Sequence, residues 1–147
     1  MDNDQIIAGF RSLRASDFDL NDVESSGMER LYELTDAALE LNEPGTLMPE
    51  MFQLMERLPE ADLGSPGPLV HTLEAMPGYE PYLSESMRRK PSSLSVWMVN
   101  RILNSSVSAD RRVVWLALLE KATEDPEIPE SVRRDARDFL TLQLRKG

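Results

Sequence analysis

The sequence contains no cysteine and a single histidine, His71. Disulfide frameworks and thiolate catalysis are therefore excluded, and a zinc site built from nitrogen and sulfur ligands is nearly excluded. Long apolar runs are also lacking, because the longest one, Val113 to Leu119, is far too short to cross a bilayer. The first residues lack the basic and apolar regions of a secretory signal. We therefore expect a cytoplasmic protein without a metal or cofactor.

Basic residues are scarce in the first part of the chain. Residues 1–64 contain fifteen Asp and Glu, four Arg and no Lys, whereas the remainder nearly balances, and the 147-residue chain has a formal net charge of −10. A field of this sign repels nucleic acid and anionic membranes, so we expect neither as a partner. It attracts a basic protein surface. Plain solubility is the alternative explanation.

Strand patterns are absent as well. No segment shows β-branched alternation, and valine and isoleucine occur inside helical patterns. We therefore predict one all-α domain over residues 1–147, with about eight helices in antiparallel hairpins. Hairpin starts near Ser26, Ser65, Ser92 and Pro129 are roughly 27 to 40 residues apart, which favours a HEAT-like or irregular α-solenoid.

Capping residues and prolines predict where the helices begin and end. Thr46, Ser65, Ser108 and either Ser92 or Ser93 are predicted N-caps, and Lys90-Pro91 is a predicted stop. The predicted helices cover about residues 4–13, 26–41, 47–58, 66–77, 81–89, 94–104, 109–124 and 131–144.

The connector from Ala15 to Ser25 alternates apolar and acidic residues. An extended segment would lay Phe18, Leu20 and Val23 against the body of the protein. A charged loop that docks on a partner is the second interpretation, and the two are compatible.

The helix after this connector separates its residues into two faces. An apolar stripe of Met28, Leu31, Leu34, Ala38 and Leu41 lies opposite four carboxylates. Like charges three and four positions apart weaken an isolated helix, which suggests solvation or a cationic partner. The acidic residues that we select as candidate partner contacts are Asp17, Asp19, Asp22, Glu29, Glu33, Asp36 and Glu40.

The helix over 94–104 places Trp97 and Arg101 on the side opposite its aliphatic residues, together with Asn100 and Asn104. In one interpretation, Trp97 packs under a neighbouring helix and the asparagines bond to loop backbone. In the other, Trp97 and Arg101 anchor a partner, because both residue types are enriched at binding hot spots.

Three further patterns have structural interpretations. The methionines around Phe52 are typical of adaptable core filling rather than of a binding groove. The last helix carries Arg133, Arg134 and Arg137, which we expect to form a solvated face with internal ion pairs. The helix over 109–124 is broadly apolar, so we expect other helices to cover it on more than one side.

His71 and Glu74 are three positions apart on a predicted helix, a spacing compatible with general acid–base chemistry. No nucleophile context accompanies them, since Ser65 follows no predicted strand and precedes a proline. No phosphate loop, calcium loop or paired-histidine motif occurs. We therefore expect a protein that is not an enzyme, in which His71 is structural.

A resemblance to a known family rests on three groups of central residues: Leu63-Gly64-Ser65-Pro66-Gly67-Pro68-Leu69-Val70-His71, then Glu74, Tyr79, Leu83, Ser86 and Arg88, and then Trp97-Met98-Val99-Asn100-Arg101-Ile102-Leu103-Asn104-Ser105. They are similar to small helical immunity proteins of bacterial polymorphic toxin systems, including contact-dependent inhibition, Rhs and type VI effectors. The resemblance covers about forty residues. It implies a HEAT-like body that binds and neutralises one cognate toxin domain, encoded by the adjacent gene. No catalytic residue is implied.

The charge agrees with this resemblance. A toxin that acts on nucleic acid, such as a nuclease, presents a basic cleft that an acidic protein can block. A non-catalytic helical adaptor that binds a peptide or a regulatory partner in a concave groove is the alternative.

Overall fold

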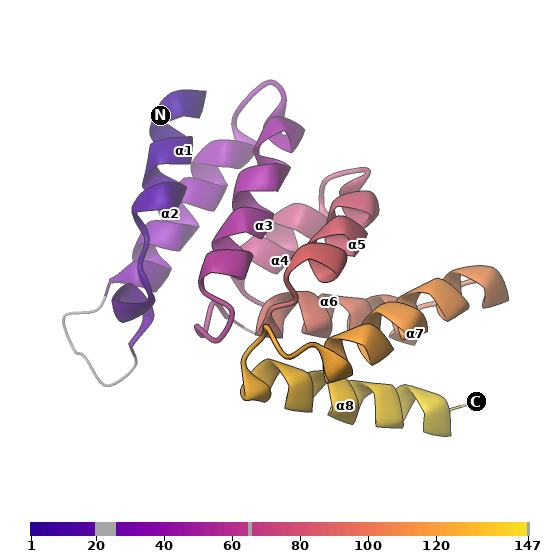
Figure 1. Ribbon diagram of the computed structural model, residues 1–147. Coiled ribbons are helices and arrows are strands. Elements are labelled where there is room, and N and C mark those ends of the chain that lie inside the picture. Colours follow the sequence, from indigo (N-terminus) through magenta and orange to yellow (C-terminus); the bar gives the residue numbers. More distant parts are fainter. Residues whose placement is uncertain (20–25, 65, 147) are drawn as a thin grey trace.

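The computed structural model describes residues 1–19, 26–64 and 66–146 (Figure 1). Within these ranges the chain forms eight α-helices, two short 3-10 helices and no strand, which confirms the all-α prediction. The elements are α1 (Asn3–Ser12), η1 (Ala15–Phe18), α2 (Gly27–Leu39), η2 (Pro44–Leu47), α3 (Met48–Arg57), α4 (Gly67–Glu74), α5 (Tyr79–Arg89), α6 (Ser93–Asn104), α7 (Ala109–Glu124) and α8 (Glu130–Arg145).

The helices stack so that most of them contact the helix two places further along the chain. Helices α1, α3, α5 and α7 follow one another in this way, and so do α2 with α4 and α6 with α8 (Figure 1). Helices α7 and α8 also pack against each other as a hairpin. Contacts between each helix and its neighbours along a stack are the defining feature of a helical solenoid.

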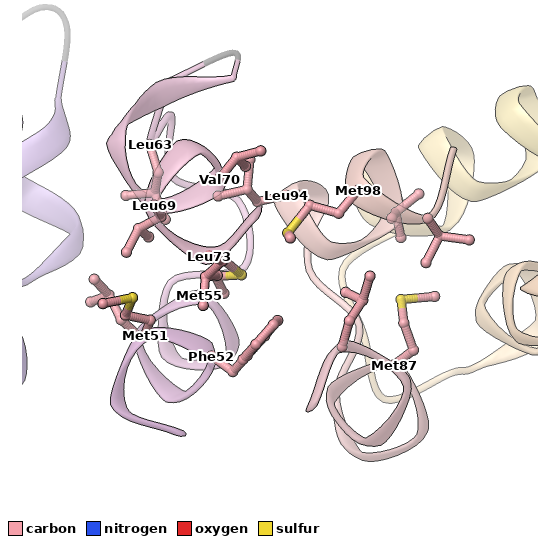
Figure 2. Close-up of a cluster of buried hydrophobic side chains, with 14 of the residues drawn as sticks. Met51, Phe52, Met55, Leu63, Leu69, Val70, Leu73, Met87, Leu94 and Met98 are labelled. Carbon is pink, nitrogen blue, oxygen red and sulfur yellow. The ribbon is translucent and has the colours of Figure 1, made fainter. Parts of the chain in front are cut away.

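One continuous apolar core runs through the stack, from Ile6 in α1 to Ala136 in α8. Figure 2 shows its central part, where Met51, Phe52 and Met55 of α3 lie near Leu73 of α4. Met87 of α5 and Met98 of α6 extend the same cluster. The methionines therefore fill the core, as predicted, because an unbranched side chain adapts to irregular gaps between helices.

Arginine–glutamate pairs join helices that are two places apart in the chain. Three of the pairs join the successive helices α1, α3, α5 and α7, and the fourth joins α4 to α6. The pairs are Arg11 with Glu50 (α1 and α3), Arg89 with Glu56 (α5 and α3), Arg101 with Glu74 (α6 and α4) and Arg111 with Glu80 (α7 and α5).

Side-chain amides connect α6 to α8. Gln143 is fully buried, and its Nε2 donates to Oδ1 of Asn100 at 2.7 Å and to Oδ1 of Asn104 at 2.8 Å. Arg112 of α7 donates to the Gln143 carbonyl oxygen at 2.7 Å. The interpretation that these asparagines bond to loop backbone is therefore wrong, because their partner is the side-chain amide of Gln143 on α8, which is distant in the sequence.

Helix boundaries followed the predicted signals in the second half of the chain. Ser92 caps α6 and Ser108 caps α7 through their side chains, and α5 ends at Arg89 before Lys90-Pro91. The Thr46 prediction is wrong, because its hydroxyl donates to the Glu43 carbonyl and α3 begins at Met48 after a 3-10 turn. Helix α4 begins at Gly67, and Ser65 lies outside the described residues.

The connector starts as the 3-10 helix η1 rather than as an extended segment. Phe18 is buried as expected, whereas Leu20 and Val23 lie outside the described residues. The expectation that helix 109–124 is covered on several sides is also wrong, since Val113 and Val114 are exposed. The predicted ion pairs of the last helix are present, because Arg133 and Arg137 both bind Glu130.

Two glycines give a direct test of how η1 packs on α2. A Cβ at Gly27 would lie 2.4 Å from the backbone oxygen of Asp17, so Gly27→Ala must displace η1. We expect a loss of about 1–3 kcal/mol in the free energy of unfolding, which is typical of overpacking. Gly45→Ala is the control: its Cβ meets nothing closer than the Met48 methyl at 3.4 Å, so about 0.5 kcal/mol of stabilisation is expected. Urea denaturation measures both, and equal effects would contradict the packing of η1.

Candidate partner-binding surface

Helix α2 buries one side and exposes the other. Leu31, Leu34 and Ala38 are completely buried against the core, where α2 contacts α1 and α4. Because these positions recur at helical spacing, the residues opposite them must point outward. We call this outward side the α2 face, and it consists of Glu29, Tyr32, Glu33, Asp36, Leu39 and Glu40.

The acidic residues of the α2 face are mostly uncompensated. Glu33 lies 3.6 Å from Arg30, an exposed pair of the kind that contributes little. Within the part of the chain that the structure describes, no Lys or Arg forms an ion pair with Glu29, Asp36 or Glu40. Arg11, Arg89, Arg101 and Arg111 instead pair with glutamates of other helices in the stack.

Two of these carboxylates oppose the stability of their own helix. Glu40 is the C-cap residue of α2 and Asp36 lies in its last turn, which contains no basic residue. The C-terminus of a helix carries partial negative charge, so each carboxylate there costs a few tenths of a kcal/mol. Helix stability therefore does not explain why acidic residues occupy these positions.

The α2 face also exposes apolar surface among its charges. The side chain of Tyr32 is 49% exposed and that of Leu39 is 47% exposed. Sequence reasoning missed both residues, although their spacing from Asp36 places them on the same side of the helix. Tyrosine is enriched at binding hot spots, so the face combines charge with an aromatic group that a partner can bury.

Two of the remaining predicted acids, Asp17 and Asp19, lie in η1 and directly after it. Asp17 caps η1, because its Oδ2 accepts from the Arg14 N–H at 2.8 Å, and its backbone lies against Gly27. Asp19 is exposed immediately after η1, and Asp22 lies outside the described residues.

Trp97 and Arg101 lie on α6, in a different part of the stack from the α2 face. Trp97 is half-buried against the core, and the Arg101 guanidinium lies 5.0 Å from the centroid of its ring. Arg101 also donates two hydrogen bonds to Glu74, at 2.8 and 2.9 Å, which raise its pKa. The Arg101 guanidinium therefore links α6 to α4. It lies beside a pocket of about 410 Å³ that Tyr79 also lines.

His71 and Glu74 do not come together as an acid–base pair. The His71 side chain is exposed on α4, while Glu74 is bound to Arg101. In the same part of the chain, no group of three potential ligands could hold a metal ion. No described helix has the length and apolar composition needed to cross a membrane.

Comparisons with protein-family models, with curated proteins and with solved structures found no match to this chain.

The ion pair between Arg101 of α6 and Glu74 of α4 can be tested by Arg101→Met, which removes the two hydrogen bonds to Glu74 and the contact with Trp97. We expect the free energy of unfolding to fall by about 1 kcal/mol, from a part-buried ion pair and a cation–π contact of modest size. Arg88→Met is the matched control, because Arg88 contacts Glu85 and the Ser84 hydroxyl on the exposed surface of its own helix, so the substitution should change stability very little. Urea denaturation that gave the two variants the same stability would contradict a special role for Arg101.

Proposed function

We propose that this chain is a non-catalytic binding protein whose α2 face docks on a basic surface of a partner protein. The observation that carries the proposal is the set of uncompensated carboxylates on this face, around the exposed Tyr32 and Leu39. Charge of this kind accelerates association and orients the partner, whereas Tyr32 contributes affinity when the partner covers it.

The partner that best fits the sequence resemblance is a cognate bacterial toxin encoded by the adjacent gene. The chain then acts as a cytoplasmic immunity protein of a polymorphic toxin system. A toxin that cleaves nucleic acid must attract phosphates, so its active-site region is basic and complementary to the α2 face. The protein neutralises the toxin by remaining bound to it, which requires no catalytic residue.

Co-expression is the first test of this function. The chain should co-purify with the protein encoded immediately upstream, and should restore growth to cells that express that protein. If no complex forms and growth is unaffected, the immunity proposal fails. The adaptor alternative would then be pursued by identifying partners bound to the purified protein.

Charge reversal tests the role of the α2 face. Replacing Glu29, Asp36 and Glu40 with Lys should slow association with the toxin at least about tenfold at low salt, and should reduce the dependence of the on-rate on ionic strength. Stopped-flow or surface plasmon resonance kinetics at several salt concentrations give this measurement.

The control carries the same change in net charge at another place. Glu120, Glu124 and Glu127 are exposed near the end of α7, and among the described residues they form no ion pair. Their reversal to Lys should slow association much less. If both triple variants slow it equally, net charge and not the α2 face steers the partner.

A further inference from the structure

A second acidic surface lies away from the α2 face, in a cleft between the α3–α4 loop, the start of α6 and α8. Its volume is about 300 Å³, at the lower limit for small-molecule sites. Its charged groups are Glu60 and Asp62 of the loop and Asp135 of α8, and its aromatic walls are Trp97 and Phe139. A space of this size suits one long side chain.

The three carboxylates of the cleft are held by neutral donors alone. Glu60 accepts from the Ser131 hydroxyl, Asp62 from the Gly64 N–H at 3.1 Å, and Asp135 from the Ser93 hydroxyl at 3.1 Å. Among the described residues, no Lys or Arg forms an ion pair with any of them. These hydrogen bonds fix the carboxylates in place but leave their negative charge without a counter-charge.

The walls of the cleft favour a planar cation. Trp97 and Phe139 are both half-buried, and Arg101 already stacks over the Trp97 ring. A guanidinium can contact aromatic rings and bind carboxylates through paired hydrogen bonds, and it is more weakly hydrated than an ammonium group. An arginine therefore fits this combination of groups better than a lysine does.

We propose that this cleft receives an arginine side chain from the partner protein. The proposal rests on the proposed function only in that the partner is a basic protein. The cleft adjoins the start of α2, because a Cβ built on Gly64 would lie 3.5 Å from the Met28 methyl.

The test uses short peptides and needs no toxin. The chain has two tryptophans, Trp97 and Trp115, so its indole N–H groups give two signals in an NMR correlation spectrum, which Trp97→Phe assigns. The probe is acetyl-Gly-Arg-Gly-amide, and its twin contains citrulline, which has nearly the same shape without the charge. The arginine peptide should shift the Trp97 signal and the backbone signals of residues 60–63, and should bind at least about fivefold more tightly than the citrulline and lysine peptides.

Matched variants locate the site. Asp135→Asn should weaken binding of the arginine peptide about fivefold to tenfold, whereas Asp138→Asn, the same change on the exposed side of the same helix, should not. If Asp135→Asn does not fold, Glu60→Gln replaces it, with Glu127→Gln as its control. Equal binding of the arginine and citrulline peptides, or equal effects of a variant and its control, would overturn the proposal. Equal binding of the lysine peptide would overturn its specificity for arginine.

The peptide and toxin experiments fail independently. Peptide binding without a toxin complex would support the cleft and remove the immunity function. A toxin complex that forms normally with a chain unable to bind the arginine peptide would support the immunity function and remove the arginine site in the cleft.

Discussion

Burial of α3 is the constraint on which the rest of the structure depends. Met51, Phe52, Leu54 and Met55 are all essentially inaccessible to solvent, although they point to different sides of one short helix. A helix that is apolar on several sides is stable only when other helices cover it. Helices α1 and α5 cover α3, one before it and one after it in the stack. The stack therefore has to extend from α3 in both directions.

The packing of α3 also requires a positive charge beside it. Glu56 is buried on α3, and burial of an unpaired carboxylate would be costly, so it accepts hydrogen bonds from Arg89 and Ser86. Similar pairs join the other helices of the stack. These guanidinium groups are neutralised by carboxylates of other helices, whereas Glu29, Asp36 and Glu40 of the α2 face and the three carboxylates of the cleft form no ion pair with a described Lys or Arg. The binding proposals thus follow from the same packing that forms the core.

Much of the fold was predictable because helix signals are local. Ser92 and Ser108 cap the helices that they were expected to cap, and the apolar spacing of Leu31, Leu34 and Ala38 identified the buried side of α2. The site was less predictable. Tyr32 and Leu39 belong to the α2 face, but periodicity alone does not say that no other helix will cover them. The cleft combines residues from three separate segments, and no local pattern relates Glu60 to Asp135.

The sequence by itself determined the helical class, most helix boundaries and the acidic character of the first 64 residues, because propensity, capping and charge belong to individual residues and their near neighbours. Tertiary structure decided which charges are balanced. Glu74 and Glu29 are both helical glutamates, yet Arg101 binds one and no described arginine or lysine pairs with the other. The physical reason is that an ion pair between stacked helices depends on how those helices pack, and packing depends on the whole core.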